Sequence, residues 1–556
     1  MRKFIYTASR LLLLFLVHNI APALPVRAQG QQQQQASGTY LTYSDNRLIL
    51  TESYRITSRP DGTVTTEGEI TPANGGAKQK MLTMAGKTKP DSFSFEVGGA
   101  KALEGKFGEG VVTINAAGRP EREVRTRATV VLENLVWHQF VFLLGQYDEA
   151  RGGQQNFNAF LPSQGVEYPL TVEYAPAQTY TLGDHTTVAT RRYKVVAAGA
   201  LALNLWTDEA RVPLLFRVET QGIKVVRQGF ENLAEAAFGA PAAYKPPAYA
   251  AAASFGEQEL IVGAGGAWPL PATLTLPHGK GPFPAIVLVH GSGPNDRDET
   301  LRANKPFRDL AWGLASQGIA VLRYEKRTRE HETKIAASTP NFTVKEETID
   351  DALAAVRLLR QTAGIDAKRI FVLGHSLGGM LVPRIGARDA AIAGFVVLAG
   401  ATRPIEDTMV RQFEYMAALD GTVSEAERAQ IKEARRQAAE VKAFKPGTDD
   451  RYLVYGAPPG YWLDLRGYNP PRAARALKRP ILILQGERDY NVTMDDFRNW
   501  RAALAGQKEI EFTSYPKLDH LFYEGEGAAS GADYERPRNI PKYVIDDIAA
   551  WIRKQR

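Results

Sequence analysis

Residues 374–378 read Gly-His-Ser-Leu-Gly, directly after the short apolar run Ile370–Leu373. A buried strand that ends in this pattern indicates a strand–turn–helix unit, because the two glycines permit a turn too sharp for residues that carry a Cβ atom. In such a turn the hydroxyl of Ser376 projects from the edge of a parallel sheet. The pattern is short enough to occur by chance, so its interpretation depends on chemical partners elsewhere in the chain.

A histidine partner follows from the chemistry of serine. The hydroxyl is a weak nucleophile until an imidazole takes its proton, and a carboxylate must orient that imidazole. In proteins whose nucleophilic serine lies in such a strand–turn–helix unit, the acid follows the serine and the histidine comes last. His520 is the only histidine after Ser376, and it follows the apolar stretch Ile510–Tyr515, a predicted late strand. The sequence therefore nominates His520 as the general base.

The acid is expected between these two residues, in the loop after another strand. Ile481–Leu484 is a predicted strand, and the residues that follow it, Gln-Gly-Glu-Arg-Asp, place Asp489 in that loop. Glu487 and Asp519 are alternatives. Asp519 adjoins the histidine and is expected to point away from it, so we assign the acid to Asp489 and a loop-orienting role to Asp519.

A fourth feature lies upstream of the serine. The predicted buried strand Pro284–Val289 runs directly into His-Gly-Ser-Gly-Pro at 290–294. Acyl transfer places negative charge on the carbonyl oxygen, which fixed backbone N–H groups stabilise. The expected donors are the residue after the nucleophile and one in this loop, which are the amides of Leu377 and Ser292. The alternative is a glycine-rich loop without a catalytic role.

The segment 290–300, HGSGPNDRDET, resembles the oxyanion loop of a group of bacterial α/β-hydrolase esterases, in which it reads HGSGP-[NQ]-DRDE. That group is related to dienelactone hydrolases and to the catalytic domains of prolyl-oligopeptidase-like peptidases. The resemblance covers roughly residues 255–556 and includes Gly-Glu-Arg-Asp-Tyr-Asn-Val and Asp-His-Leu-Phe. It implies an α/β-hydrolase fold, the triad Ser376, Asp489 and His520, and hydrolysis of carboxylic esters.

The same resemblance implies two groups of residues near the pocket. Arg297, with its neighbours Asp296, Asp298 and Glu299, is expected either to shape the pocket mouth and contact substrate or to form structural ion pairs, and we favour the ion pairs. Tyr324 and Lys326 follow the predicted strand Ile319–Leu322 and match a region of the family that borders the active site.

From about residue 254 onward, helical and strand patterns alternate, with Val344–Arg360 as an amphipathic helix. This alternation predicts an α/β domain over 254–556, a mostly parallel sheet with helices on both faces. An insertion of about seventy residues, 402–475, separates two of the strands and contains the helical segment Ser424–Phe444. We expect a helical cap whose aromatic end, Tyr461 and Trp462, forms apolar walls for an acyl or alcohol group. The alternative is a surface excursion.

Residues 38–235 have a different pattern, an alternation of apolar and polar residues with Gly, Asn and Asp between the runs. This pattern predicts an antiparallel all-β accessory domain that precedes the α/β domain. Residues 236–253 are rich in Pro and Ala and predict a semi-rigid linker. Residues 29–37 are rich in Gln and are expected to be a disordered tether.

Residues 1–28 carry basic residues, then the apolar run Leu11–Val17, then small residues around Val26-Arg27-Ala28. This order is typical of a secretory signal peptide, and the run is too short to span a membrane; an uncleaved anchor is the alternative. We expect a periplasmic or secreted protein with no integral membrane segment in the mature chain. Since the sequence contains no cysteine, it predicts neither a lipidation site nor a disulfide framework nor a thiolate metal site.

The charge balance argues against one class of partner. The formal net charge is +7, and the signal removes four basic residues and no acid, which leaves +3 for the mature chain. No basic run with interleaved aromatic residues is present, so nucleic acid is not an expected partner. The expected partner is a small-molecule ester, with no cofactor and no metal, and the sequence leaves the oligomeric state open.

Three functions are compatible with these residues. The first is an exported serine hydrolase that cleaves carboxylic esters through an acyl-enzyme on Ser376. The second is a prolyl-oligopeptidase-like peptidase, which the same triad would serve; against it, the N-terminal region is too short for a propeller and has no repeat of propeller length. The third is a non-catalytic binding protein with a hydrolase fold, against which the intact set of catalytic residues argues.

The signal pattern makes a direct prediction. We expect the mature N-terminus near Gln29, because the small residues Val26 and Ala28 precede it. Intact-mass measurement of protein recovered outside the cytoplasm checks this, and exported protein that retains residues 1–28 would contradict it.

Overall fold

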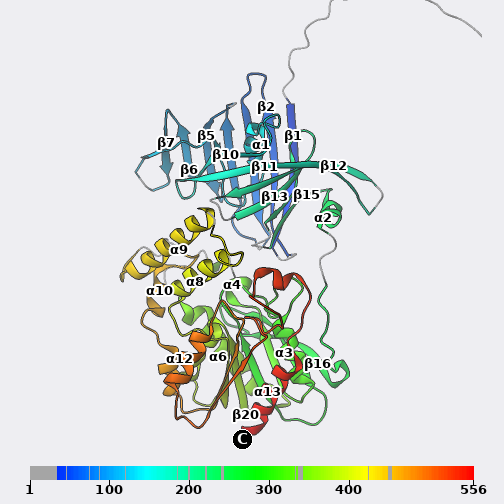
Figure 1. The fold of residues 1–556 in the computed structure, drawn as a ribbon, viewed down its shortest axis with the longest axis vertical. Coiled ribbons are helices and arrows are strands. Elements are labelled where there is room, and N and C mark those ends of the chain that lie inside the picture. Colours follow the sequence, from blue (N-terminus) through cyan, green and yellow to red (C-terminus); the bar gives the residue numbers. More distant parts are fainter. Residues whose placement is uncertain are drawn as a thin grey trace, which may run out of the picture.

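The computed structural model describes residues 34–555, apart from gaps at 45–46, 74, 87, 119, 184–185, 198–200, 219–221, 239–242, 332–333, 336–341, 424 and 449–453. The predicted signal peptide and the first part of the predicted tether lie outside the described residues. The chain forms an N-terminal β domain and a C-terminal α/β domain, which lie at opposite ends of the molecule (Figure 1).

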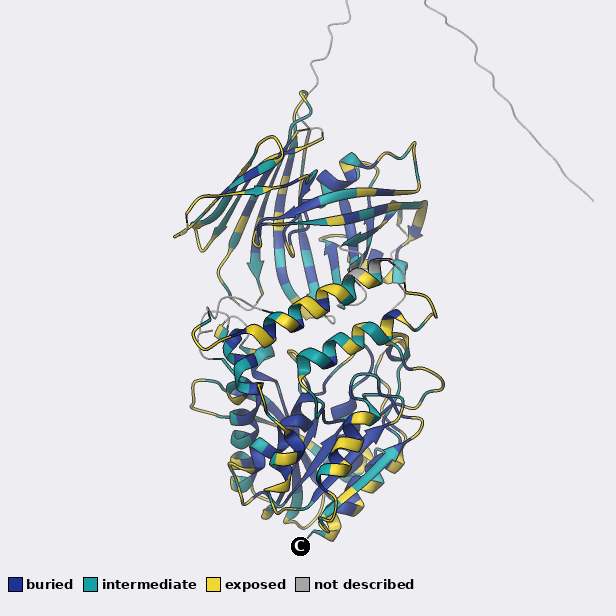
Figure 2. Cartoon of the chain, turned by 60° about the vertical axis from the view of Figure 1, so that its left-hand side comes forward, coloured by how far each residue is buried: buried dark blue, intermediate teal, exposed yellow. Residues whose placement is uncertain are grey.

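The β domain is one strongly curved sheet of fifteen strands in the described part of the chain (Figure 2). Its order is β8 to β1 and then β15 to β9, so most pairs are neighbours in sequence. All pairs are antiparallel except β9 and β10, which are parallel. Strand β2 shows the underlying pattern, since it buries every second residue from Leu50 to Ile56, as expected when one face of a sheet packs on a core. The strands are β1 (Gln34–Ser44), β2 (Arg47–Ser58), β3 (Val64–Pro72), β4 (Gln79–Ala85), β5 (Pro90–Val97), β6 (Ala100–Phe107), β7 (Val111–Ala116), β8 (Arg122–Arg125), β9 (Val130–Val131), β10 (Gln154–Leu161), β11 (Val166–Thr181), β12 (Thr187–Ala197), β13 (Leu201–Thr207), β14 (Pro213–Val218) and β15 (Ile223–Arg227).

Two features of this domain differ from the prediction. Residues 34–37, assigned from sequence to a disordered tether, belong to β1, where they pair with residues 55–58 of β2. Backbone hydrogen bonds hold this end of the strand, and they do not depend on the polar Gln side chains. The described part of the domain also contains the helices α1 (Phe140–Gln146), which packs into the core, and α2 (Glu231–Phe238), which continues past residue 235.

The predicted α/β fold is confirmed. The sheet has the order β16-β17-β19-β18-β20-β21-β22-β23, in which β16 and β17 are antiparallel to their neighbours and the remaining strands are parallel. Parallel strands covered on both faces have continuous apolar sequences, and β21 and β22 are buried along their whole length. The strands are β16 (Phe255–Val262), β17 (Leu270–Pro277), β18 (Phe283–Val289), β19 (Ala320–Tyr324), β20 (Ile365–His375), β21 (Gly394–Leu398), β22 (Ile481–Gly486) and β23 (Ile510–Tyr515).

Helices cover both faces of this sheet, and alternate residues of one strand point to different faces. In β18, Ile286 and Leu288 pack with α3 (Pro306–Ala315) and α13 (Lys542–Lys554). Ala285, Val287 and Val289 pack on the opposite side with a second set of helices. That set comprises α6 (Asp350–Gln361), α7 (Leu377–Gly386) and α12 (Met494–Ala503). A π-helical segment, η4 (Lys345–Ile349), leads into α6, and α4 (Arg327–Glu330) follows β19.

Four helices lie between β21 and β22 in the described part of the insertion. They are α8 (Ile405–Ala417), α9 (Glu425–Ala443), α10 (Pro459–Leu465) and α11 (Pro470–Arg475). In both ribbon views α8 and α9 lie between the curved sheet of the β domain and the body of the α/β domain (Figures 1 and 2). The insertion therefore occupies the space where the two domains face each other.

The segment that joins the domains is held by the α/β domain near its end. The hydroxyl of Tyr244 donates to Oδ1 of Asp309 at 2.8 Å, and the hydroxyl of Tyr249 donates to the carbonyl of Ile540 at 2.7 Å. Two tyrosines of the predicted linker thus attach its last residues to the α/β domain.

Among the described residues, no helix combines the length and hydropathy needed to cross a membrane.

Candidate active site

Ser376 lies at the junction of β20 and α7 with φ 52° and ψ −113°. This left-handed backbone is strained for a residue with a Cβ atom, and such strain is found at functional turns. A Cβ atom on Gly374 would lie 2.3 Å from the carbonyl of Gly378, and one on Gly378 would lie 2.3 Å from the carbonyl oxygen of Val289. Both glycines are therefore required, one by the turn itself and one by the contact with the end of β18.

The acid and the base lie on adjacent loops, after β22 and β23. Nδ1 of His520 lies 2.7 Å from Oδ2 of Asp489. Asp489 is buried, and its other oxygen accepts the N–H groups of Asn491 at 2.8 Å and Val492 at 2.9 Å. The side chain of Gln485 donates to Oδ2 at 3.1 Å. A carboxylate held in this way keeps a proton on Nδ1, so that Nε2 carries the lone pair that accepts the proton of a serine.

The two alternative acids have other partners. Glu487 accepts the hydroxyl of Ser514 at 2.8 Å. Asp519 accepts the N–H groups of Leu521 and Tyr523, each at 3.0 Å, and burial raises the pKa of its carboxyl to about 6. Asp519 thus binds backbone N–H groups of the turn that carries the histidine, and Asp489 is the carboxylate that contacts the imidazole. The catalytic roles of both stay predictions.

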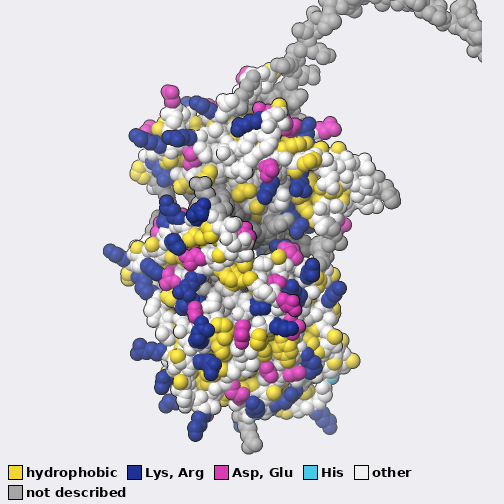
Figure 3. Space-filling view, viewed as in Figure 1, with side chains coloured by type: hydrophobic (Ala, Val, Ile, Leu, Met, Phe, Trp, Pro, Cys, Tyr) yellow, Lys and Arg dark blue, Asp and Glu magenta, His cyan; other side chains and the backbone are white. Residues whose placement is uncertain are grey.

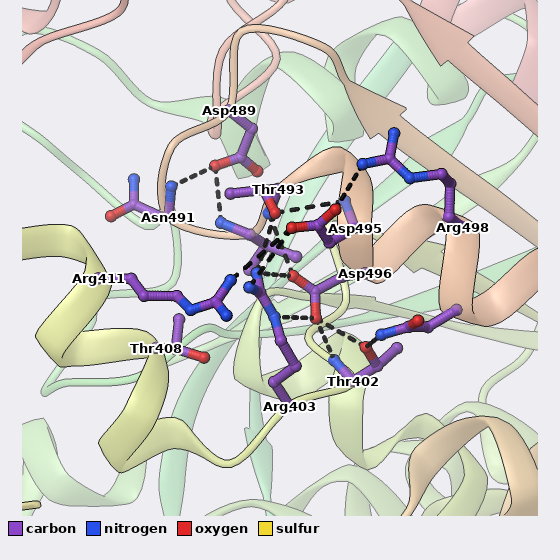
Figure 4. A network of polar contacts seen from close by, with 12 residues as sticks. Thr402, Arg403, Thr408, Arg411, Asp489, Asn491, Thr493, Asp495, Asp496 and Arg498 are labelled. Carbon is purple, nitrogen blue, oxygen red and sulfur yellow. Dashed lines mark hydrogen bonds and ion pairs between the residues drawn. The ribbon is translucent and has the colours of Figure 1, made fainter. Parts of the chain in front are cut away.

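The loop that carries Asp489 is fastened to the beginning of the insertion (Figure 4). Asp496, which is fully buried, accepts the N–H of Thr402 at 2.9 Å and pairs with Nη2 of Arg403 at 2.5 Å. The same Nη2 donates to the hydroxyl of Thr493 at 2.9 Å. A shift of the insertion at this point would therefore move the loop that holds Asp489.

The predicted oxyanion loop packs against the serine turn. A Cβ atom on Gly291 would lie 3.2 Å from the Cβ of Ser376. The N–H of Gly291 donates to Oε1 of Glu299 at 2.6 Å, and its carbonyl accepts Nζ of Lys326 at 2.7 Å. Leu377, the second predicted donor, is the first residue of α7, where a backbone N–H has no acceptor within the helix. Leu377 thus directly follows Ser376 at the start of α7, and Ser292 directly follows Gly291, which packs against Ser376; their role as oxyanion donors stays a prediction.

A buried ion pair connects the oxyanion loop to the histidine loop. Nδ1 of His375 lies 2.9 Å from Oε2 of Glu299, and Nε2 lies 3.0 Å from the carbonyl oxygen of His520. Each ring nitrogen lies within 3.0 Å of an oxygen atom, and the nearby Glu299 carboxylate favours the positively charged imidazolium. Burial opposes the charge of His375, but the Glu299 carboxylate outweighs it and raises the pKa of the imidazole. Burial likewise opposes the charge of Glu299, but His375 outweighs it and lowers the pKa of the carboxyl.

The three predicted substrate-binding residues have protein partners. Tyr461 and Trp462 are buried in the core, where the hydroxyl of Tyr461 donates to Oε2 of Glu347 at 2.8 Å and Nε1 of Trp462 donates to the carbonyl of Val454 at 3.1 Å. Arg297 pairs with Glu325 at 2.8 Å and with Glu259 at 2.6 Å. The ion-pair interpretation of Arg297 accounts for these contacts. Substrate contact by any of the three stays a prediction.

Sequence reasoning missed three residues that support the site. His375 is part of the serine motif, but the motif assigns it no role. Gln485 was detectable as a polar residue at the end of an apolar strand, where a buried amide needs a partner. The sequence does not single out Glu347 as a buried residue, because its position in an amphipathic helix is typical of a solvated face.

Among the residues that the structure describes, no group of three or more His, Asp or Glu side chains is placed to hold a metal ion.

Comparison with known proteins matches residues 286–529 to the Alpha/beta hydrolase family. The esterase EstD of Thermotoga maritima is 41% identical over 311 residues, which cover 56% of this chain and 71% of that protein. A monoacylglycerol lipase of Mycolicibacterium smegmatis is 27% identical over 188 residues, 33% of this chain and 61% of that protein. Among solved structures, an esterase of Pyrococcus furiosus is 14% identical over 54% of this chain and 91% of its own, with a TM-score of 0.35.

The His375–Glu299 pair makes a prediction about pH. A histidine with a raised pKa in the folded state stabilises it fully below its ordinary pKa of 6.5 and loses this effect as pH rises through the folded value. A glutamate with a lowered pKa stabilises above its ordinary 4.5 and loses this effect as pH falls. We therefore expect the stability advantage of the natural chain over His375→Gln to be largest between pH 4.5 and 6.5 and to shrink above that window.

Denaturant unfolding of both chains across this pH range checks the prediction. His278→Gln is the matched control, because His278 is exposed and its imidazole contacts a backbone carbonyl, that of Ala253, instead of a carboxylate. An advantage over His375→Gln that grows with rising pH would contradict the charged pair.

Proposed function

Because the chain belongs to the α/β-hydrolase family, we propose that it is an exported serine esterase that cleaves carboxylic esters through an acyl-enzyme on Ser376. One observation carries the proposal: Nδ1 of His520 lies 2.7 Å from Oδ2 of the buried Asp489. The contact of His375 with the carbonyl of His520 ties this pair to the residue that precedes the serine. The similarity to an esterase over 71% of that protein's length supports the ester bond as the bond cleaved.

The proposed reaction has two halves. His520 takes the proton of the Ser376 hydroxyl, and the serine oxygen attacks the ester carbonyl. The amides of Leu377 and Ser292 donate to the oxygen that becomes negative. His520 then gives its proton to the departing alcohol, which leaves an acyl group on the serine. In the second half a water molecule, deprotonated by His520, attacks the acyl carbonyl, and the carboxylic acid leaves as the proton returns to Ser376.

Asp489 contributes through orientation and charge. Its Oδ1 is occupied by two backbone N–H groups, so the carboxylate cannot rotate away from the imidazole. The negative charge stabilises the imidazolium that forms when His520 takes the serine proton. The fastening of the same loop through Asp496 to Arg403 supports this orientation at a second point.

Export is a separate part of the proposal and rests on sequence alone. The basic residues, the short apolar run and the small residues of 1–28 support cleavage and release into the periplasm or the medium. On the face shown in Figure 3, basic and acidic side chains are interspersed over both domains. A mixed distribution of this kind accords with a small-molecule substrate.

The triad makes a quantitative prediction. Asp489→Asn is expected to lower kcat for an aryl ester by about 10⁴-fold, because the amide favours the wrong imidazole tautomer. Ser376→Ala is expected to abolish covalent labelling by a fluorophosphonate. Glu487→Gln is the matched control, since Glu487 contacts Ser514 instead of His520, and it should leave kcat unchanged. Near-normal turnover by Asp489→Asn would remove Asp489 from the triad.

The choice of ester over peptide makes a further prediction. An amide nitrogen must be protonated as it departs, and efficient amidases hold an extended chain to position that nitrogen. We therefore expect kcat/KM to be much larger for acetyl and butyryl aryl esters than for aminoacyl and dipeptidyl anilides. Steady-state kinetics on both substrate sets decides this. Anilide turnover equal to ester turnover would replace the esterase by a peptidase.

A further inference from the structure

Lys326 is a buried cation next to the oxyanion loop. Only 2% of its side chain is exposed, and it lies just beyond Glu325, the residue that follows β19. Its Nζ lies 2.7 Å from the carbonyl oxygen of Gly291 and 2.8 Å from Oε1 of Glu347. Burying an ammonium group is costly unless a counter-charge and hydrogen bonds replace water. Here Glu347 supplies the counter-charge, and the second contact is directed at one backbone carbonyl.

Glu347 connects this lysine to the insertion. Its Oε2 accepts the hydroxyl of Tyr461 at 2.8 Å, and Tyr461 belongs to α10. Burial raises the pKa of Tyr461, so the hydroxyl remains a donor. A continuous series of polar contacts thus extends from the insertion through Tyr461, Glu347 and Lys326 to the carbonyl of Gly291.

The geometry of the peptide gives that last contact a consequence. The peptide between Gly291 and Ser292 is trans, and in a planar trans peptide the C=O and N–H bonds point in opposite directions. A group that fixes the direction of the Gly291 carbonyl therefore also fixes the direction of the Ser292 N–H. The positive charge at the oxygen also polarises the peptide and strengthens the N–H as a donor.

The preceding peptide is fixed by the opposite charge. The N–H of Gly291 donates to the Glu299 carboxylate at 2.6 Å, and the side chain of Asn295 donates to the carbonyls of Gly291 at 3.2 Å and Ser292 at 3.0 Å. Asn295 is neutral, only half-buried and farther from the Gly291 oxygen than Lys326 is. In the part of the chain that the structure describes, Lys326 is thus the nearer of the two donors to that carbonyl and the one that carries a charge.

We propose that Lys326 is a positioning residue of the oxyanion hole: it holds the Gly291 carbonyl so that the Ser292 N–H faces the reacting oxygen, and Tyr461 makes this alignment depend on the seating of the insertion. The inference rests on the proposed function, because it requires Ser292 as an oxyanion donor. It gives Tyr461 a role at the site that does not require contact with substrate.

The test compares an aryl ester with its thionoester, in which sulfur replaces the carbonyl oxygen and accepts hydrogen bonds weakly. Lys326→Met is expected to lower kcat for the ester by roughly 10²-fold, the scale of losing one oxyanion donor, with little change in KM. The thionoester rate should fall less, so the ratio of ester to thionoester kcat decreases. A general loss of folded or correctly packed enzyme would lower both rates together and leave this ratio unchanged.

Further variants separate the positioning role of Lys326 from the loss of a buried charge. Lys326→Met leaves Glu347 unpaired, so the double variant Lys326→Met/Glu347→Gln removes both charges and is expected to show the same decrease in the ratio. Lys305→Met is the matched lysine control, because Lys305 pairs with Asp298, which keeps Arg323 and Arg308 as partners. It should leave the ratio unchanged. Tyr461→Phe should decrease the ratio in the same direction but to a smaller extent.

The outcomes separate this inference from the proposed function. If Ser376→Ala abolishes ester hydrolysis and the folded Lys326 variants keep the natural ratio, the positioning role is wrong and the esterase stands. An unchanged ratio in Tyr461→Phe alone would overturn the link to the insertion. If Ser376→Ala retains hydrolysis, the proposed function itself fails, whatever the ratio.

Discussion

The site depends on one close approach of two backbones, where β18 and β20 end beside each other. Gly378 at the start of α7 lies so near the carbonyl of Val289 that a Cβ atom there would lie 2.3 Å from the oxygen. This contact places the serine turn against the oxyanion loop without intervening side chains. Because the two strands are parallel neighbours, their carboxyl ends meet at one edge, which is where open α/β sheets carry their sites.

Buried charges then fix the loops that this contact brings together. Glu299, Lys326 and Asp489 are each almost completely buried, and each has a backbone or side-chain partner at hydrogen-bond distance. A buried charge without its partner is strongly destabilising, so each loop has one low-energy position. The same property makes the site sensitive to single substitutions, since removing one partner leaves the other charge uncompensated.

Several residues of the insertion contact this system, among them Arg403 and Tyr461. Arg403, just before α8, holds Asp496 beside the acid loop, and Tyr461 of α10 holds Glu347 behind the oxyanion loop. Helices α8 and α9 of the same insertion lie between the two domains (Figures 1 and 2). The β domain contributes none of the polar partners of the triad described above.

The sequence by itself determined the α/β fold and located the strands that precede Ser376, Asp489 and His520, whose catalytic roles stay predictions. Local patterns suffice for these, because a strand is recorded in its apolar run and Ser376, Asp489 and His520 each follow such a run. Only the tertiary structure determines which residues Tyr461 and Lys326 contact and that strand β1 begins at Gln34. Their roles arise from partners distant in the chain, Glu347 for both side chains and β2 for the strand. Periodicity carries no information about such pairs, because hydrogen bonds and ion pairs form only once the sheet has placed their partners together.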